Sequence, residues 1–180
     1  AAQSLVVERV LEQQVQSVLE QEDIALYQIG RLFLPPVFFK LIDVPDVLIV
    51  ACRDRFEMRS QVAVRRTITT QQADDLENAV DGDLNVSSLL VPIGGYSTYP
   101  TMIAGTAPRD FVIGAITHEW CHIYLTFRPL GAAYGKSGEV TAMNETVCGI
   151  FGDDVAALVR EAYYGAEKTP RPWETPPTPA

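Results

Sequence analysis

Positive charge, cysteine, histidine and long apolar runs are all scarce in this chain. Its 14 Lys and Arg residues are outnumbered by 23 Asp and Glu residues, which gives a formal net charge of −9. Such a charge repels nucleic-acid phosphates and anionic lipid headgroups, so it argues against both as partners. No run of about 18 or more residues is apolar and uncharged, so the sequence contains no candidate membrane-spanning helix.

Only three cysteines are present, Cys52, Cys121 and Cys148, and no two of them form a CxxC pair. Three cysteines cannot all pair within one chain. Cys121 and Cys148 fall in apolar helical surroundings, where a free cysteine usually packs as a small hydrophobic residue. The cysteines therefore indicate core thiols rather than a redox centre, and they leave the cellular compartment open.

The composition is that of one globular domain. The chain has 180 residues, 47 % of them hydrophobic and 21 % charged, which is enough to bury a core without metal or disulfide staples. We expect a single domain over residues 1–167 and a disordered, proline-rich tail over 168–180. From the proline-rich end and a first residue that is not Met, we expect either an extracytoplasmic protein or a soluble domain excised from a larger, membrane-anchored protein.

The hydrophobic pattern predicts an α+β fold. Apolar residues recur at steps of three and four near the N-terminus, which is typical of a helix that packs on its own domain. β-Branched runs and alternating segments predict a mostly antiparallel sheet of about four strands, packed against a central helix. Pro100 makes the last strand an edge strand. The expected helices cover residues 1–30, 70–80, 108–127 and 137–164, and the expected strands cover 37–42, 47–52, 56–65, 89–93 and 96–103.

Both histidines of the chain lie in one segment, His118-Glu119-Trp120-Cys121-His122. Residues four apart are about one helical turn from each other, so His118 and His122 project from one face of the predicted helix and can share an ion. Neutral imidazole is a good zinc ligand. Glu119 leaves the helix about 100° from His118, so its carboxylate lies beside the metal and can accept a proton from an activated water. The competing interpretation is a pair of core histidines without a metal.

A catalytic zinc site usually needs a third protein ligand and one open position. We favour Glu145 because it is the one long side chain on a stripe of small residues along the last predicted helix. Such a stripe lets another helix approach closely, and this brings Glu145 to the contact. The alternative interpretation is that the glycines only allow two helices to pack closely and that the stripe has no role in metal binding or catalysis. The stripe consists of Ala142, Glu145, Gly149, Gly152 and Ala156, and the other acidic candidates are Glu139, Asp153 and Asp154.

These residues resemble the motifs of the gluzincin branch of the zincin metallopeptidases, which includes thermolysin-like and aminopeptidase-like enzymes. The resemblance covers roughly residues 108–156, and Glu145 follows His122 after 22 intervening residues. It implies a zincin-like fold in minimal single-domain form, with Zn²⁺ held by His118, His122 and Glu145 and with Glu119 as general base. It also implies that an edge strand, here residues 96–103, binds the substrate backbone.

The sequence also departs from the patterns of related branches. Leu125 and Arg128 stand where the metzincin branch needs Gly and His, and Cys148-Gly149 stand where thermolysin-like enzymes carry a Ser-Asp pair. The Asp that would orient a zinc-bound histidine is therefore missing from that position.

No third histidine is available to stabilise an oxyanion, so a tyrosine is the expected replacement, as in the aminopeptidase-like relatives. Tyr163, near the end of the last helix, is the candidate that we retain. Tyr164 and Tyr134 are further candidates, and ordinary packing is the competing role of all three.

The sequence thus predicts a zinc-dependent hydrolase, a metallopeptidase that cleaves a peptide or protein substrate with zinc-activated water and Glu119 as general base. One alternative is a non-catalytic zinc-binding domain that recognises a peptide or partner through residues 96–103. The other is a structural domain without a metal. The cleavage preference, the choice between endo- and exo-action, and the oligomeric state are left open.

Overall fold

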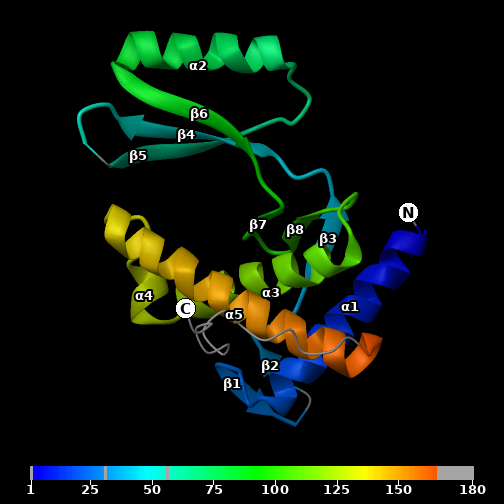
Figure 1. The fold of residues 1–180 in the computed structure, drawn as a ribbon. Helices are drawn as coiled ribbons and strands as arrows, with labels where there is room; N and C mark the ends of the chain where they lie inside the picture. Colours follow the sequence, from blue (N-terminus) through cyan, green and yellow to red (C-terminus); the bar gives the residue numbers. More distant parts are fainter. Residues whose placement is uncertain (1, 31, 56, 166–180) are drawn as a thin grey trace, which may run out of the picture.

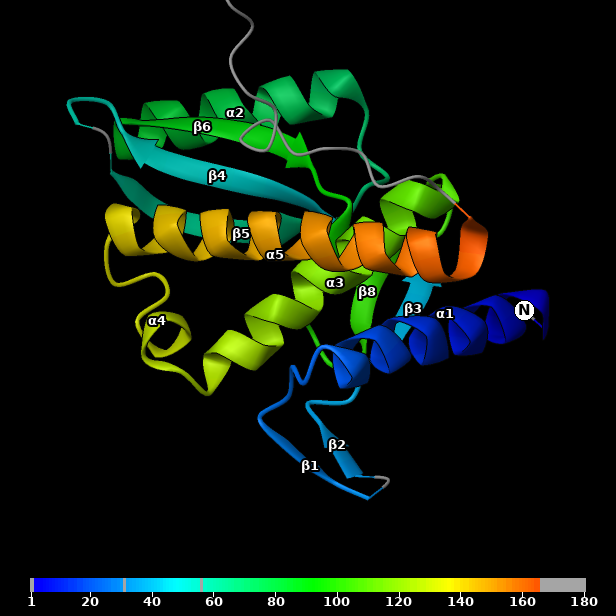
Figure 2. The same cartoon turned by 60° about the horizontal axis from the view of Figure 1, so that its bottom comes forward.

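The structure, a computed structural model, describes residues 2–30, 32–55 and 57–165, so the expected tail at 168–180 lies outside the described residues. It confirms the α+β class. Figure 1 shows α3 (Arg109–Thr126) and α5 (Gly138–Tyr164) side by side at the centre of the molecule. From both viewpoints, α1 (Ala2–Gln21) lies on one side of this pair, and a small sheet with its own helix lies on the other (Figure 2).

The two central helices agree with the predicted bounds because local signals begin and end them. The Ser137 side chain accepts a hydrogen bond from the Val140 backbone at the start of α5, and Gly165, with φ 64°, ends it in a left-handed conformation. Pro108 precedes α3. The main core lies between α1, α3, α5 and the nearest strands, and its fully buried side chains include Val15, Leu19, Phe39, Ile103, Ile113, Ile116 and Val159.

The expectation of one sheet of about four strands is wrong, because the strands of the described residues form three small sheets. One contains β3 (Phe39–Ile42), β8 (Thr101–Ala104) and β7 (Gly95–Tyr96), and β3 and β8 run parallel. A second, antiparallel sheet contains β5 (Met58–Val64), β4 (Asp46–Cys52) and β6 (Val86–Pro92). The chain leaves the first sheet through Asp43-Val44-Pro45, where proline has no N–H to continue a ladder. It builds the second sheet before it returns to β7.

The N-terminal helix is shorter than the expected 1–30. It ends at Gln21, and Asp23 takes a left-handed conformation with φ 55°. A two-stranded hairpin follows, formed by β1 (Tyr27–Ile29) and β2 (Leu32–Leu34). The hairpin is stabilised by Phe33, which is 4 % exposed and stacks on Trp120 of α3. This long-range contact outweighs the local tendency of the segment to continue as helix.

The expected edge strand over 96–103 is also incorrect. A turn at Ser97–Pro100, in which the Thr98 hydroxyl donates to the Pro100 carbonyl at 2.8 Å, divides the segment into β7 and β8. β8 lies in the middle of its sheet, between β3 and β7. Only the two-residue β7 therefore forms the edge next to α3.

The second sheet carries α2 (Thr70–Leu84) on one face, and Leu48, Val50 and Val86 form a small separate core there. A capping box starts α2, with Thr69 and Gln72 bonding to each other's backbone N–H groups. The opposite face of the sheet, including Val47, borders a cavity that reaches α3 and α5. Within the described residues, no helix combines the length and the apolar character needed to cross a bilayer.

Candidate metal centre

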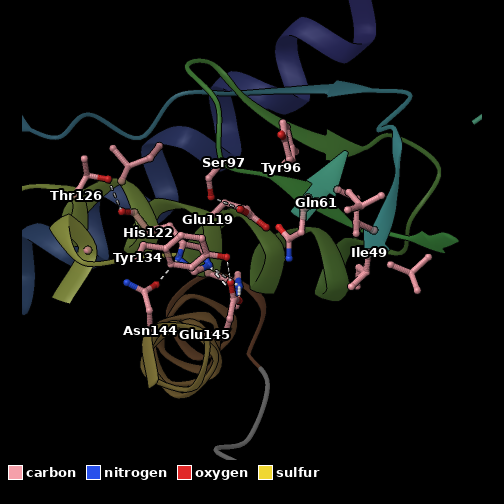
Figure 3. Close-up of a pocket in the computed structure, with 18 residues that line it drawn as sticks. Ile49, Gln61, Tyr96, Ser97, Glu119, His122, Thr126, Tyr134, Asn144 and Glu145 are labelled. Atoms are coloured by element: carbon pink, nitrogen blue, oxygen red, sulfur yellow. Dashed lines mark hydrogen bonds and ion pairs between the residues drawn. The ribbon is translucent and has the colours of Figure 1, made fainter. Parts of the chain in front are cut away.

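Three side chains from α3 and α5 converge on one point. His118 Nε2 lies 3.1 Å from His122 Nε2, and Glu145 Oε2 lies 3.5 Å from the former and 3.4 Å from the latter. Figure 3 shows Asn144 and Glu145 projecting from α5 toward His122 and Tyr134. Among the described residues, these three form the one set of His, Cys, Asp or Glu side chains that can hold a metal ion in this way. Glu139, Asp153 and Asp154 do not belong to it.

The spacing of these atoms fits a shared cation. Ligands about 2.0–2.1 Å from a tetrahedral ion lie about 3.3 Å from one another. The observed separations of 3.1, 3.4 and 3.5 Å lie around that value. The Glu145 side chain is 45 % exposed, so the centre is open to solvent on one side. His118, His122 and Glu145 can therefore hold a metal ion and leave a position open for a further ligand.

Asn144 fixes the orientation of His122. Its Oδ1 lies 2.7 Å from His122 Nδ1, and because a carbonyl oxygen can only accept, Nδ1 carries the proton and donates. The Nε2 lone pair of a neutral His122 then points at His118 and at the Glu145 carboxylate. Asn144 is 1 % exposed, so water does not compete for this bond. Asn144 thus has the orienting role for which the sequence offers no Asp.

Close packing brings together the two helices that carry the candidate ligands. A Cβ atom at Gly152 would lie 3.1 Å from the backbone of His118, and Thr117 donates a hydrogen bond of 2.9 Å to the Gly152 carbonyl. The predicted reason for the small-residue stripe is therefore confirmed at Gly152. The same prediction is wrong at Gly149, because a Cβ atom there would have no neighbour within 4 Å and the residue borders a cavity instead.

The charges of the centre suit a cation. The interaction with His118, and with His122 when its Nε2 carries a proton, holds the pKa of the Glu145 carboxyl well below its usual range, so it stays ionised. Burial lowers the pKa of His122, but its hydrogen bond and charge attraction to Glu145 outweigh burial and raise the pKa above the ordinary value. A proton on His122 and a metal ion thus compete for the same lone pair.

Glu119 lies beside the three ligands and is held from the opposite side by β7 and the turn after it. The Ser97 hydroxyl donates to Glu119 Oε2 (Figure 3), and a Cβ atom at Gly95 would lie 2.6 Å from Glu119 Oε1. Burial raises the pKa of the Glu119 carboxyl, and the Ser97 hydrogen bond offsets only part of this rise. A half-buried carboxyl with a raised pKa is suited to accept and return a proton.

The retained tyrosine candidate, Tyr163, is far from the centre. It is 18 residues beyond Glu145 on the same straight helix, which is about 27 Å along its axis. Tyr134 stands at the centre instead, and its hydroxyl donates to Glu145 Oε1 at 2.7 Å. Gly131 makes this possible, because a Cβ atom there would lie 2.0 Å from the Leu125 carbonyl oxygen. The short α4 (Pro129–Ala132) can thus fold back on α3.

Two cysteines pack between the same helices. Cys148 and Cys121 are free and buried, with their sulfur atoms 2.8 Å apart, and Cys148 Sγ lies 3.4 Å from His122 Nδ1. Cys148 borders the Asn144 side of the His122 ring, with its sulfur 3.8 Å from Asn144 Oδ1. Their surroundings are those of core thiols.

Two cavities open onto the centre. The larger, about 660 Å³, lies between α3, α5 and the second sheet, and it includes all three ligands, Glu119 and Tyr134. The smaller, about 370 Å³, continues from His118 and Glu119 toward the N-terminal half of α3.

Sequence reasoning gave no role to two residues of this centre, and it ranked a third, Tyr134, below Tyr163. Asn144 directly precedes Glu145, and Ser97 lies within the segment expected to bind substrate, but neither position follows a spacing that marks it. Tyr134 was one of three candidate tyrosines, and only the return of the chain at Gly131 distinguishes it.

In comparisons with known proteins, no protein-family model, no curated protein and no solved structure matches the chain.

Proposed function

We propose that this protein is a zinc-dependent hydrolase, a metallopeptidase of the gluzincin type of zincin. The observation that carries the proposal is the convergence of His118, His122 and Glu145 within 3.1–3.5 Å, with a proton-accepting carboxyl, Glu119, directly beside them. Two imidazoles and one carboxylate favour zinc over magnesium or calcium, which prefer oxygen ligands. One open position is typical of catalytic rather than structural zinc sites.

When bound here, zinc would supply Lewis acidity, which polarises a carbonyl and makes water more acidic. The residues of the chain supply the rest. Asn144 holds His122 in the tautomer that presents Nε2. Glu119 accepts a proton from the attacking water and delivers it to the leaving amine. Ser97 and Gly95 contact the Glu119 carboxylate and limit its movement beside the centre.

The edge of β7 supports a peptide as substrate. β7 pairs with β8 on one side only, and its Gly95 touches the general base. A substrate backbone can add to such an edge through main-chain hydrogen bonds, which fixes the scissile bond next to Glu119 without demands on side chains.

Tyr134 takes the role for which Tyr163 was considered. Burial and the adjacent Glu145 carboxylate raise the pKa of the Tyr134 hydroxyl, so it remains a hydrogen-bond donor over the whole working range. A donor next to a metal ligand is placed to bind the oxygen on which charge develops during hydrolysis.

Metal analysis and one conservative variant test the proposal. The purified protein should bind one zinc ion per chain, and it should cleave an unfolded protein such as reduced casein. Glu119→Gln should keep the zinc and lower the hydrolysis rate by about 100- to 10,000-fold, because only the proton acceptor is lost. Glu139→Gln is the matched control, since Glu139 is an exposed carboxylate in the first turn of α5.

The results separate the alternatives. Bound zinc without any cleavage by the wild type would favour a non-catalytic recognition domain. A protein that does not bind zinc at all would favour a structural domain.

A further inference from the structure

The two cavities at the metal centre extend from it in opposite directions. Both are bordered by His118, Glu119 and the Gly94-Gly95 pair. The smaller continues along α3 to Asp110, eight residues before His118, and the larger continues to Thr126, eight residues after it. From Asp110 to Thr126 the two cavities follow α3 for about 24 Å of its axis. An extended chain rises about 3.3 Å per residue, so about seven substrate residues correspond to this length.

Glycines from both central helices form part of the lining of the smaller cavity. Gly114 of α3 and Gly149 of α5 both border it, and a Cβ atom at either would have no heavy atom within 4 Å. These glycines are therefore not required for helix packing, although each weakens its helix by about 1 kcal/mol relative to Ala. Because glycine has no side chain, the cavity stays open at these two positions, beyond the metal centre.

Neither cavity has a set of charged side chains of a single sign that could bind the free end of a peptide. Among the described residues that border the larger cavity, the only carboxylates are Glu119 and Glu145, which belong to the centre, and none is Lys or Arg. In the smaller cavity, the charged side chains are of mixed sign, namely Asp110, Asp153 and Arg160. An exopeptidase needs a charged group that holds the free amine or carboxylate of its substrate within a residue or two of the scissile bond.

We infer that the centre is that of an endopeptidase: an extended polypeptide lies through both cavities and is cut at an internal bond beside Glu119. This inference rests on the proposed hydrolase function and specifies its substrate class. The oxygen of water bonds to the scissile carbonyl carbon and the C–N bond breaks. The proton that Glu119 takes from the water goes to the leaving nitrogen, which departs as an amine.

Peptides with blocked ends test the inference directly. The probes are ten-residue peptides that are N-acetylated and C-amidated, paired with the same sequences with free ends, and the products are identified by mass spectrometry. We expect internal cleavage of both forms, with kcat/KM values that agree within about threefold. Release of single terminal residues from free-ended peptides alone would overturn the inference and leave the metallopeptidase proposal standing. No cleavage of either form by the zinc-loaded protein would overturn both.

A variant that fills the smaller cavity provides an independent test. Gly149→Leu places a side chain in open space, so it should fold, bind zinc like the wild type and lower kcat/KM for the blocked peptides by at least tenfold. Gly82→Leu is the matched control, because Gly82 is also a helical glycine with no atom within 4 Å of a Cβ, but it lies in α2 and borders neither cavity. Wild-type kcat/KM in zinc-loaded Gly149→Leu would overturn the inference.

Discussion

Removal of the Asn144 amide should weaken metal binding without loss of a ligand. In the Asn144→Ala variant, His122 loses the acceptor that lies 2.7 Å from its Nδ1. The ring can then rotate, and its two tautomers become closer in energy. Because Asn144 is 1 % exposed, bulk water does not simply replace the lost partner. The alanine also favours the α5 helix, so the fold should be retained.

The magnitude follows from the role of the hydrogen bond. Partners that orient metal-bound histidines typically contribute about 10- to 100-fold in metal affinity, or about 1.4 to 2.7 kcal/mol. At a free zinc concentration 100 times the wild-type Kd, zinc stabilises the wild type by about 2.7 kcal/mol. A Kd that is weaker by about 10- to 100-fold reduces this to about 1.4 to 0.4 kcal/mol in the variant.

Two assays measure the effect. Competition with a chromophoric zinc chelator gives the Kd, and thermal unfolding with and without zinc gives the stabilisation. Asn144→Asp keeps an acceptor at the same place and should retain wild-type affinity or exceed it. Ser88→Ala is a control that removes a hydrogen bond of the same 2.7 Å length, from Ser88 to Asp81, away from the centre. A folded Asn144→Ala protein whose Kd lies within twofold of wild type would refute the reasoning.

Three further predictions concern the same centre. Gly95→Ala places a Cβ atom 2.6 Å from Glu119 Oε1, so it should displace the Glu119 carboxylate and lower kcat by about 100-fold. Zinc content and thermal stability should stay as in the wild type, and an unchanged kcat would contradict the prediction. Tyr134→Phe should lower kcat by about 100-fold with zinc still bound, and a kcat within twofold of wild type would limit Tyr134 to orienting Glu145. Zinc affinity should fall as the pH decreases through the raised pKa of His122, because the proton then held by His122 must be displaced; a Kd that does not change from about pH 8.5 to about pH 5.5 would contradict this.

The candidate ligands could be predicted from the sequence because helical geometry is local. The four-residue spacing of His118 and His122 places them on one face of any helix, whatever surrounds it. Glu145 was identified from the small residues around it, and the contact of Gly152 with His118 shows why this pattern is informative. The zinc ion, the catalysis and the substrate remain proposals, because they depend on chemistry that neither the spacing nor the fold measures.

Strand pairing was harder to predict than the helices. Caps such as Ser137 and Thr69 are local signals, and the structure places helix boundaries next to them. Which strands pair depends on long-range contacts, and here the chain interrupts its first sheet after Ile42 to build another one. The turn at Ser97–Pro100 likewise divides a segment that the sequence predicts as one strand.

By itself, the sequence determined the α+β class, the two central helices and the pairing of His118 with His122, because each depends on residues within a few turns of one another. Only the tertiary structure decided that Asn144 orients His122, that Ser97 binds Glu119 and that Tyr134 rather than Tyr163 stands at the centre. These contacts depend on how α5 is rotated against α3 and on where two loops return to the helix pair. The rotation of the helices and the paths of the loops arise from the packing of segments that are far apart in the sequence, and no local spacing encodes them.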